Sequence, residues 1–507
     1  MAQPSSNPTC SGTANIILRS SEDDPEHMLP HQRKAAMKKP KATRSVLHID
    51  GRTGEGGGQL IRIACAIASV ITQPIRITNV RGNRDRGGGL KAQHVASIEW
   101  LAKVTDAEVN GLTVGSTTLE FKPRETPATS KLFTGIHDRT VKIAADSAAA
   151  STLLIFQAIF PFLLFAGGNT GKRQDHPEHI DVEISGGTNV SFSLSYEYLD
   201  QVLLPSLEQA FGIVVERKLR TRGWNLGKMQ RGTVAFRIHP IRVGDSLRLR
   251  NPTACTMKGR NRKGEDFDLE AIDVSIIAPT DMHESLSQAL VQNLGDLFPD
   301  VEVIFKPMED SGANTRIYVL LVARSWPSDV EGEAGAGAVL RWGRDILTSM
   351  PKAANSKKGK NKGDSNGSSS HAGTGGVASM SESVATKVAR ALYDEVSTGG
   401  VVDEFLQDQL VIFQALASGL SAFPRGNSDP ADDNVSGPGI EAAMAALDLT
   451  DKNATQGLRK DKTAEPFGEG TLHAKTARWM VSELLPNVKF YNKGKVCEGV
   501  GFAVEKP

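Results

Sequence analysis

One histidine lies where a helix is expected to begin, and its type and position suit chemistry. His473 lies in GTLHAKTARW, where a Gly-Thr pair precedes apolar residues at helical spacing. This pattern predicts a capped helix with His473 in its first turn. An ordinary helix with a polar first turn explains the same residues, so the local pattern alone does not assign a role to the histidine.

A glycine-rich loop over residues 50–59, DGRTGEGGGQ, joins a predicted strand to a predicted helix. Its glycines would let backbone amides approach an anion at the helix N-terminus. Glu55 lies among them and could face a metal ion. The loop is not a Walker loop, because no Gly-Lys-Ser/Thr closes it. A tight turn is the alternative interpretation.

A second loop, RGNRDRGGGLKAQH over residues 81–94, concentrates positive charge before the next predicted helix. Its cations are Arg81, Arg84, Arg86 and Lys91, and Asp85 alone opposes them. The loop is either a phosphate-sized positive patch or a solvated charged segment. Gln93 and His94 open the helix that follows, whose apolar face leaves both side chains free to point at the patch.

The segment VVDEFLQDQLVIFQALASG, which begins at residue 401, is predicted to be a mostly apolar helix that carries a few polar side chains. Asp408 and Gln409 lie either at its solvent edge or in a pocket, and the pattern alone favours the edge. Two further histidine patterns are weaker. His176 and His179 have no third ligand at a useful spacing for a metal. His48 in LHIDG takes the place of the lysine in the K-x-D-G signature of adenylating ligases, and we interpret it as a strand residue.

The elements that must position these residues are predicted to repeat. From Val46 and again from Thr140, short β-branched strands and helices with 3.6-residue spacing follow one another in the order βαβαββ. A third, incomplete copy lies at the end, and an α/β stretch interrupts the series. The fold class predicted is α+β, with three βαβαββ modules and one smaller inserted α/β domain.

Segment boundaries follow from composition. Residues 352–380 and the stretch from Pro424 to about Phe467 are poor in large apolar side chains, which predicts disorder or inserted loops, although 440–449 could form a short helix. The expected segments are a disordered tail (1–44), modules 1 and 2 (45–240), the inserted domain (about 241–350), a disordered insertion (351–380) and a third module (381–507) with a low-complexity insertion (424–467).

Composition excludes several classes of protein. Four scattered cysteines in 507 residues neither staple the chain nor form a zinc knuckle, which fits a reducing compartment. The most apolar run, which begins at Leu153, is broken by Gln157 and Pro161 and falls short of the roughly 18 residues that a membrane span requires, so we expect a buried helix and no membrane partner. A basic cluster between Arg33 and Arg44 is a nuclear address, a nucleic-acid arm or a solvated tail.

Taken together and in this order, the motifs DGRTGEGGGQLIRIA, RGNRDRGGGLKAQH, VGSTTLEF, EISGGTN, VDEFLQDQLVIFQALASG and TLHAKTA resemble RNA 3'-terminal phosphate cyclase. The resemblance runs from about Val46 to Phe502 outside the two insertions, and it is strongest to the version found in nucleated cells. It implies three βαβαββ modules with an inserted α/β domain, in agreement with the repeat. It also implies a nuclear location, with the cytoplasm as a second one.

The resemblance implies an ATP-dependent ligase that converts an RNA 3'-phosphate into a 2',3'-cyclic phosphate. His473 would take AMP from ATP, AMP would pass to the RNA phosphate, and the 2'-hydroxyl would then displace AMP. A histidine at a helix N-terminus stays neutral and nucleophilic, because the helix dipole disfavours its charged form. Protein partners are not indicated.

The other site residues are carried over by the same resemblance. Gln157 and the run Phe405, Leu406, Gln407, Asp408 and Gln409 would line the ATP pocket, which reverses the solvent-edge interpretation of Asp408 and Gln409. Glu55 would help to place Mg²⁺ or Mn²⁺ with the ATP phosphates. The residues that would hold phosphates of ATP or RNA are Arg62, Arg81, Arg84, Gln93 and His94.

The sequence departs from the family pattern at three places. Gly87 to Gly89 replace a Pro-Gly, Leu194 replaces a usual proline of the nucleotide site, and GWNLGKMQRGTV lacks a proline and a glycine triplet. The alternative function is a catalytically impaired, cyclase-like RNA-binding protein that acts in ribosomal RNA processing. Loss of the active-site histidine and of the GEGGGQ loop distinguishes that branch, and this chain keeps both.

Overall fold

The computed structural model describes residues 44–85, 87–133, 139–167, 179–250, 269–326, 339–350, 372–426 and 458–505. Helices and strands alternate along these residues, and the strands form four small sheets. The fold class is therefore α+β, as the sequence predicts. Within the described residues, none of the helices combines the length and the apolar character needed to cross a membrane.

The first sheet pairs its strands in the order β1-β2-β4-β3. The β1–β2 pair is parallel and the other two pairs are antiparallel. A helix connects β1 to β2 and another connects β2 to β3, which is the crossover that parallel strands require. The elements are β1 (Leu47–Asp50), α1 (Gly58–Ile71), β2 (Ile75–Thr78), α2 (Ala92–Val104), β3 (Glu108–Asn110) and β4 (Leu119–Lys122).

The second sheet repeats this topology in the order β5-β6-β8-β7, again with one parallel and two antiparallel pairs. Its first helix, α3, is apolar all round, and every residue of α3 except Gln157 is buried. Helices α1 and α2 both pack on α3. The elements are β5 (Thr140–Ala144), α3 (Thr152–Leu164), β6 (Ile180–Gly186), α4 (Tyr196–Tyr198), η1 (Leu199–Leu203), α5 (Leu204–Phe211), β7 (Val215–Thr221) and β8 (Gly232–Ile238).

The third sheet is smaller, with three described strands in the order β13-β15-β14, all antiparallel. Helix α8 packs against α10, and α10 also packs against α1 of the first sheet. Because this sheet has no parallel pair among its described strands, the third copy of the predicted module stays a prediction. The elements are α8 (Glu404–Leu416), β13 (Ser418–Ala422), α10 (Leu472–Leu484), β14 (Lys489–Tyr491) and β15 (Val496–Val500).

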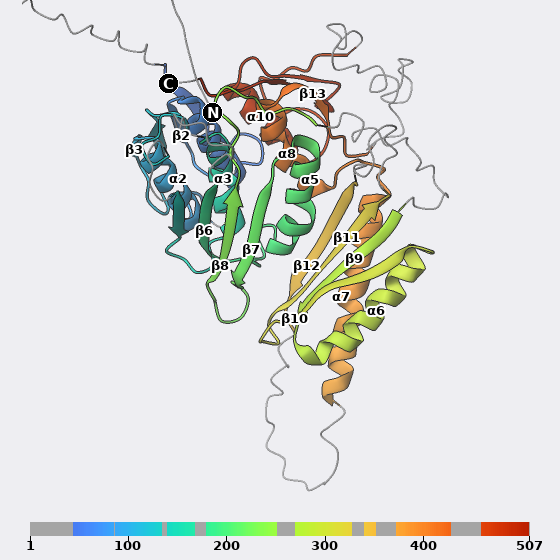
Figure 1. Cartoon of the computed structure of the whole chain (residues 1–507). Coiled ribbons are helices and arrows are strands. Elements are labelled where there is room, and N and C mark those ends of the chain that lie inside the picture. Colours follow the sequence, from blue (N-terminus) through green and yellow to red (C-terminus); the bar gives the residue numbers. More distant parts are fainter. Residues whose placement is uncertain are drawn as a thin grey trace, which may run out of the picture. The chain divides into compact units, whose positions relative to one another are not determined.

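The fourth sheet has the order β10-β9-β11-β12 and belongs to the predicted inserted domain. Figure 1 shows α6 and α7 side by side on one face of this sheet, although about 75 residues separate them in the chain. The elements are β9 (Leu269–Ala278), η3 (Thr280–Met282), α6 (His283–Leu297), β10 (Glu302–Asp310), β11 (Ile317–Ser325), β12 (Arg341–Thr348) and α7 (Ala372–Val396).

Helix α7 moves the expected boundaries of this unit. It begins at Ala372, inside the stretch 351–380 that composition assigns to a disordered insertion. Its apolar residues between Val384 and Val396 share one core with α6 and the fourth sheet, so the helix belongs with the inserted unit rather than with the third module. At the other end, Leu247 joins the larger core, and its carbonyl accepts the N–H of Ser418 next to β13.

The second predicted insertion, 424–467, is also shorter in the structure. Leu458 packs against the small core of the third sheet, and Lys460 forms a β-bridge with Tyr491. Apolar contacts therefore order the end of this stretch despite its composition. The short helix predicted for 440–449 lies outside the described residues.

One buried carboxylate couples the fourth sheet to α8. Asp403 caps α8, because its Oδ1 accepts the N–H groups of Phe405 at 2.9 Å and Leu406 at 2.8 Å. The hydroxyl of Tyr198 donates to the same oxygen at 2.7 Å. On β12, the backbone N–H of Gly343 donates to Oδ2 at 2.7 Å. Asp403 is fully buried, so its loss would leave four donors without an acceptor.

Replacing Asp403 with alanine should therefore lower the free energy of unfolding by about 2 to 4 kcal/mol, since a helix cap and the acceptor of buried donors are lost together. Urea unfolding followed by circular dichroism measures the change. The control is Asp394→Ala on the exposed side of α7, where the Arg390 pair is solvated and the expected change is below about 0.5 kcal/mol. Equal losses for the two variants would contradict the role given to Asp403.

Candidate active site

His473 lies in the first turn of α10, where the sequence predicts it. Thr471 caps this helix by accepting the N–H of Ala474 at 3.2 Å. The imidazole is accessible to solvent, and its Nδ1 lies 3.2 Å from Oε1 of Gln59. The capped first turn thus places an accessible histidine against a buried amide of α1.

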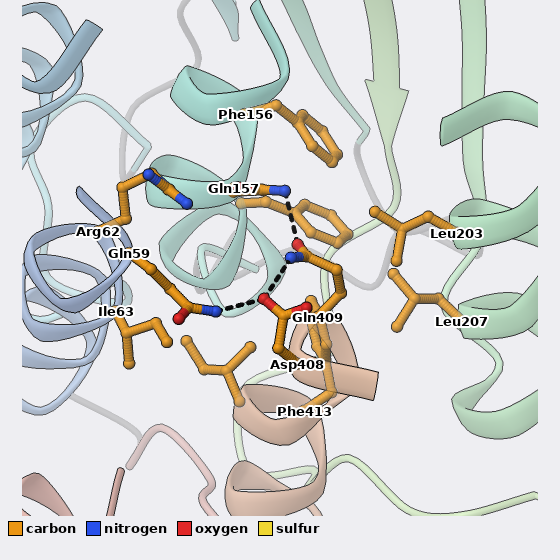
Figure 2. Close-up of a pocket in the computed structure, with 12 residues that line it drawn as sticks. Gln59, Arg62, Ile63, Phe156, Gln157, Leu203, Leu207, Asp408, Gln409 and Phe413 are labelled. Atoms are coloured by element: carbon orange, nitrogen blue, oxygen red, sulfur yellow. Dashed lines mark hydrogen bonds between the residues drawn. The ribbon is translucent and has the colours of Figure 1, made fainter. Parts of the chain in front are cut away.

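Gln59 begins a chain of hydrogen bonds that reaches three further helices. Its Nε2 donates to Oδ2 of Asp408 on α8, and Nε2 of Gln409 donates to the same oxygen at 2.8 Å. From α3, Nε2 of Gln157 donates to Oε1 of Gln409 at 2.6 Å. Figure 2 shows these side chains turned toward one another between α1, α3 and α8. The connected network therefore has five polar side chains: His473, Gln59, Asp408, Gln409 and Gln157.

The network determines which nitrogen of His473 carries hydrogen. The amide nitrogen of Gln59 donates to Asp408, so the amide oxygen is the end that faces the histidine. That oxygen can only accept, and Nδ1 must therefore be the protonated nitrogen of the neutral ring. Nε2 then keeps its lone pair. This tautomer presents a nucleophile on the side of the ring away from Gln59.

Partial desolvation and nearby positive charge favour the neutral form of the ring. Desolvation, followed by the positive charges of Arg62 and Arg84, lowers the pKa of His473 below its ordinary value. Burial raises the pKa of Asp408 to about 7, and Arg62 opposes that rise. The direction for His473 agrees with the sequence argument, which invoked the helix dipole. In the structure, desolvation and the two arginines are the leading causes.

A pocket lies beside the network and has one polar and one apolar wall. Figure 2 shows Gln157, Gln409 and Asp408 on one side, with Leu203 and Leu207 of η1 and α5 opposite. Such a cavity suits a flat aromatic ring with a polar edge. The residues that line it are Gln59, Arg62, Ile63, Phe156, Gln157, Phe160, Leu203, Leu207, Asp408, Gln409, Ile412 and Phe413.

Half of the predicted nucleotide residues face this pocket. Gln157, Asp408 and Gln409 line it, whereas the three residues before Asp408 do not. The ring of Phe405 packs instead against Arg344, whose Cζ lies 4.7 Å from the centre of that ring. Leu406 and Gln407 are buried elsewhere on α8. Helical geometry explains the split, because consecutive residues of a helix point in different directions.

Donors without acceptors gather at the N-terminus of α1. Gly57 precedes the helix and provides no side-chain cap, so the first N–H groups of α1 stay available. A Cβ added to Gly58 would lie 2.6 Å from Nε2 of His94 and 3.2 Å from Nη1 of Arg62. A hydrogen-bond donor, His94, and a cation, Arg62, therefore adjoin the start of the helix. This arrangement suits an anion.

His94 contributes a neutral donor to this cluster. Its Nδ1 accepts the N–H of Lys91 at 3.1 Å, which leaves the hydrogen on Nε2. This buried Nε2 has no hydrogen-bond partner among the described residues. Burial, with the charges of Arg62, Arg81 and Lys91, holds the pKa of His94 well below its ordinary value. A buried N–H without an acceptor is costly, and an anion at the start of α1 would satisfy it.

The remaining predicted site residues lie around the same helix start. The buried carboxylate of Glu55 forms an ion pair with Arg84, and Nη1 of Arg81 donates to the carbonyl of Gly89 at 3.3 Å. Gln93 is half-buried in the first turn of α2. Within the described ranges, no group of three or more His, Cys, Asp or Glu side chains could hold a metal ion. Glu55 therefore fits only an ion that brings most of its own ligands.

The structure locates two of the three weaker histidines and two of the three departures from the family pattern. His48 is an exposed residue of β1, as predicted. Nε2 of His179 lies 3.5 Å from Oδ2 of Asp181. His176 lies outside the described residues. Leu194 packs partly buried against the main core and does not line the pocket. Gly89 has φ +79°, and a Cβ there would lie 2.3 Å from the carbonyl oxygen of Gly115, so this position requires glycine.

Sequence reasoning missed three residues that shape the site: Gln59, Asp403 in its capping role, and Thr476. Gln59 was visible as a polar residue at the start of a mostly apolar helix, but its partners come from distant segments. Thr476 looked like an ordinary polar residue of α10. Only the packing of α10 on the glycine loop shows what its hydroxyl contacts.

Comparison with known proteins points to one family. Residues 53–438 match the family model described as RNA 3'-terminal phosphate cyclase. This range includes most of the glycine loop, the arginine loop and α8, and it ends before His473. Curated proteins named RNA 3'-terminal phosphate cyclase are similar. That of Ignicoccus hospitalis is 29% identical over 381 residues, 74% of this chain and 86% of the relative. That of Methanosarcina mazei is 30% identical over 385 residues, 74% and 89% of the two chains. That of Drosophila melanogaster is 36% identical over 179 residues, 35% and 43% of the two chains.

A neutral histidine, a helix start with an unpartnered buried donor and a pocket lined by aromatic and polar side chains are features typical of enzymes that handle phosphates or nucleotides. The family match covers well over half of the chain. The chain belongs to the RNA 3'-terminal phosphate cyclase family.

The contribution of Arg62 to the lowered pKa of His473 can be tested directly. Replacing Arg62 with glutamine removes a positive charge near the ring, so the pKa of His473 should rise toward 6.5. An NMR titration of the histidine ring carbons measures this pKa. Arg52→Gln is the control, because Arg52 is exposed and pairs with Asp50. If the pKa of His473 shifts equally in both variants, Arg62 does not act on the ring.

Proposed function

We propose that this protein uses ATP to convert an RNA 3'-terminal phosphate into a 2',3'-cyclic phosphodiester. The conversion passes through a covalent histidine-AMP intermediate at His473 and then through an RNA-adenylate. The observation that carries the proposal is the network from His473 through Gln59 to Asp408 at the edge of the pocket. It supplies a neutral histidine of defined tautomer near a pocket that aromatic rings, amides and a carboxylate line.

The first step forms a bond between Nε2 of His473 and the α-phosphorus of ATP. The lone pair of Nε2 attacks, and the bond from the α-phosphorus to the bridging oxygen breaks, so that pyrophosphate leaves with the electron pair. Nδ1–H stays hydrogen-bonded to Oε1 of Gln59 throughout. That bond orients the ring and stabilises the positive charge that develops on it, as the buried carboxylate does in a catalytic triad.

Adenosine would occupy the pocket, with its base against Phe156, Phe160 and Phe413 and its polar groups toward Gln157, Gln409 and Asp408. Phosphates of ATP or RNA would be held at the start of α1. The unpartnered Nε2–H of His94 supports this placement, since phosphate oxygens are the acceptors that it lacks. Arg62, Arg81, Arg84 and Gln93 complete the phosphate-binding group that we propose.

Glu55 would supply one carboxylate to Mg²⁺ or Mn²⁺. Such ions usually keep several waters and bind one or two carboxylates together with substrate phosphates. A single glutamate beside the proposed phosphate site is compatible with such coordination. Binding the metal ion would require Glu55 to give up its ion pair with Arg84. When bound, the ion would neutralise charge on the phosphates during AMP transfer.

The later steps need no further protein nucleophile. An oxygen of the RNA 3'-phosphate attacks the phosphorus of the histidine-AMP, and the Nε2–P bond breaks to regenerate the neutral ring. The neighbouring 2'-hydroxyl then attacks the activated 3'-phosphorus, loses its proton and displaces AMP. Since the 2'-hydroxyl is on the same ribose, proximity provides much of the rate.

Covalent adenylylation is the direct test of this function. Incubation with α-labelled ATP and magnesium should attach acid-labile label to the protein, and His473→Ala should abolish it because the nucleophile is gone. The label is detected after denaturing electrophoresis. His239→Ala is the matched control, since this histidine is on the surface and pairs with Glu216. A folded wild-type protein that takes no label would overturn the proposal.

The identity of the RNA end tests the final step. A strand with a 3'-phosphate and a 2'-hydroxyl should be converted to the cyclic form, and one with a terminal 2'-deoxyribose should accumulate as the adenylate. Mass spectrometry of the oligonucleotides separates the two products. The contradictory result is that the strand with the 2'-hydroxyl also stops at the adenylate, or that the labelled enzyme adenylates neither strand.

A further inference from the structure

We propose that Thr476 is a positioning residue that holds the glycine loop, residues 50–59, in register with the nucleophile helix α10. The inference rests on the proposed function of His473. It concerns how the phosphate side of the site is aligned with the histidine, and it adds a residue that lies outside the nucleotide pocket.

The hydroxyl of Thr476 both donates and accepts a hydrogen bond. It donates to the carbonyl of Leu472 at 2.7 Å within α10, and it accepts the backbone N–H of Glu55 at 2.9 Å from the glycine loop. Thr476 is fully buried, so water cannot replace either bond. A single hydroxyl therefore joins segments that are 421 positions apart in the chain.

The glycine loop approaches α10 closely at this point. Gly54 has φ +67°, and a Cβ there would lie 2.3 Å from Oγ1 of Thr476. This combination of a left-handed conformation and missing side chain lets the loop backbone reach the hydroxyl. The contact has little freedom to slide, because any larger residue at position 54 would collide with Thr476.

The contact connects the two halves of the proposed chemistry. Thr476 follows His473 by three residues, which places the two on the same side of α10. Glu55, whose N–H is held, carries the carboxylate that pairs with Arg84. The hydroxyl thus sets the distance between the proposed nucleophile and the groups proposed to handle phosphate and metal. Neither Thr476 nor Glu55 lines the proposed adenosine pocket, which lies between α1, α3, α5 and α8.

The chain offers a close control for the hydroxyl. Ser482 lies further along α10, and its Oγ donates to the carbonyl of Arg478 at 2.8 Å. This is the same bond to the preceding turn that Thr476 makes, but no hydrogen bond to another segment is recorded for Ser482 among the described residues. Removing the Ser482 hydroxyl therefore tests the bond within the helix alone.

The test compares Thr476→Val, Thr476→Ser and Ser482→Ala in single-turnover adenylylation with labelled ATP. Valine keeps the shape and removes the hydroxyl, so the maximal rate should fall by about tenfold to a hundredfold, the scale expected for a small misplacement of reacting groups. The KM for ATP should change by less than about threefold, because the adenosine pocket is untouched. Serine should restore most of the rate, and Ser482→Ala should match the wild type.

A second variant approaches the same contact from the loop. Gly54→Ala leaves Thr476 in place but introduces the Cβ that would collide with it, so this variant should also lose maximal rate with little change in KM. Gly115→Ala is its control, since Gly115 also has a positive φ but a Cβ added there would meet nothing within 4 Å. Gly54→Ala keeps the proposal testable if Thr476→Val does not fold, which circular dichroism would reveal.

Three results would overturn the proposal: a folded Thr476→Val that keeps its maximal rate within about twofold, an equal loss in Ser482→Ala, or a Gly54→Ala variant with normal rate. These outcomes require a wild-type protein that takes label. A wild type without label would instead refute the proposed function of His473, so the two failures are distinguishable.

Discussion

The site depends on the direction of one buried amide. Gln59 is 4% exposed, and its side chain has one donating end and one accepting end. When Asp408 is ionised, a reversed amide would turn its oxygen toward the carboxylate and leave two acceptors face to face. The observed direction satisfies Asp408 and presents an acceptor to Nδ1 of His473. The nitrogen of His473 that we propose as the nucleophile is therefore selected by Asp408, a carboxylate without a hydrogen bond to the ring.

The fold provides rigid supports for this amide and its partners. Gln59 is held in the first turn of α1 where the glycine loop ends, and Asp408 is placed by α8. Asp403 caps α8 and accepts a hydrogen bond from Gly343 of the fourth sheet, so the inserted unit helps to fix the helix that carries Asp408. The nucleotide site thus depends on a sheet that contributes none of the residues lining its pocket.

Local signals in the sequence predicted what depends on local structure. The cap at Thr471 and the first-turn position of His473 follow from a few neighbouring residues, and the structure confirms them. Gln59 was not predicted, because its partners lie 349 and 414 positions away. The periodicity of one helix placed Asp408 and Gln409 at a solvent edge, whereas α1 and α3 cover that edge and make it a pocket wall. Composition likewise missed the start of α7, which is stabilised by packing on α6 and the fourth sheet.

The atom to which AMP is attached tests the central claim most directly. Protein labelled with ¹⁵N at both ring nitrogens of histidine would be adenylylated with ATP and magnesium, and phosphorus–nitrogen coupling would be read by NMR. The account predicts coupling to Nε2 of His473, with hydrogen retained on Nδ1. Coupling to Nδ1, or to another histidine, would contradict the tautomer that Gln59 and Asp408 impose.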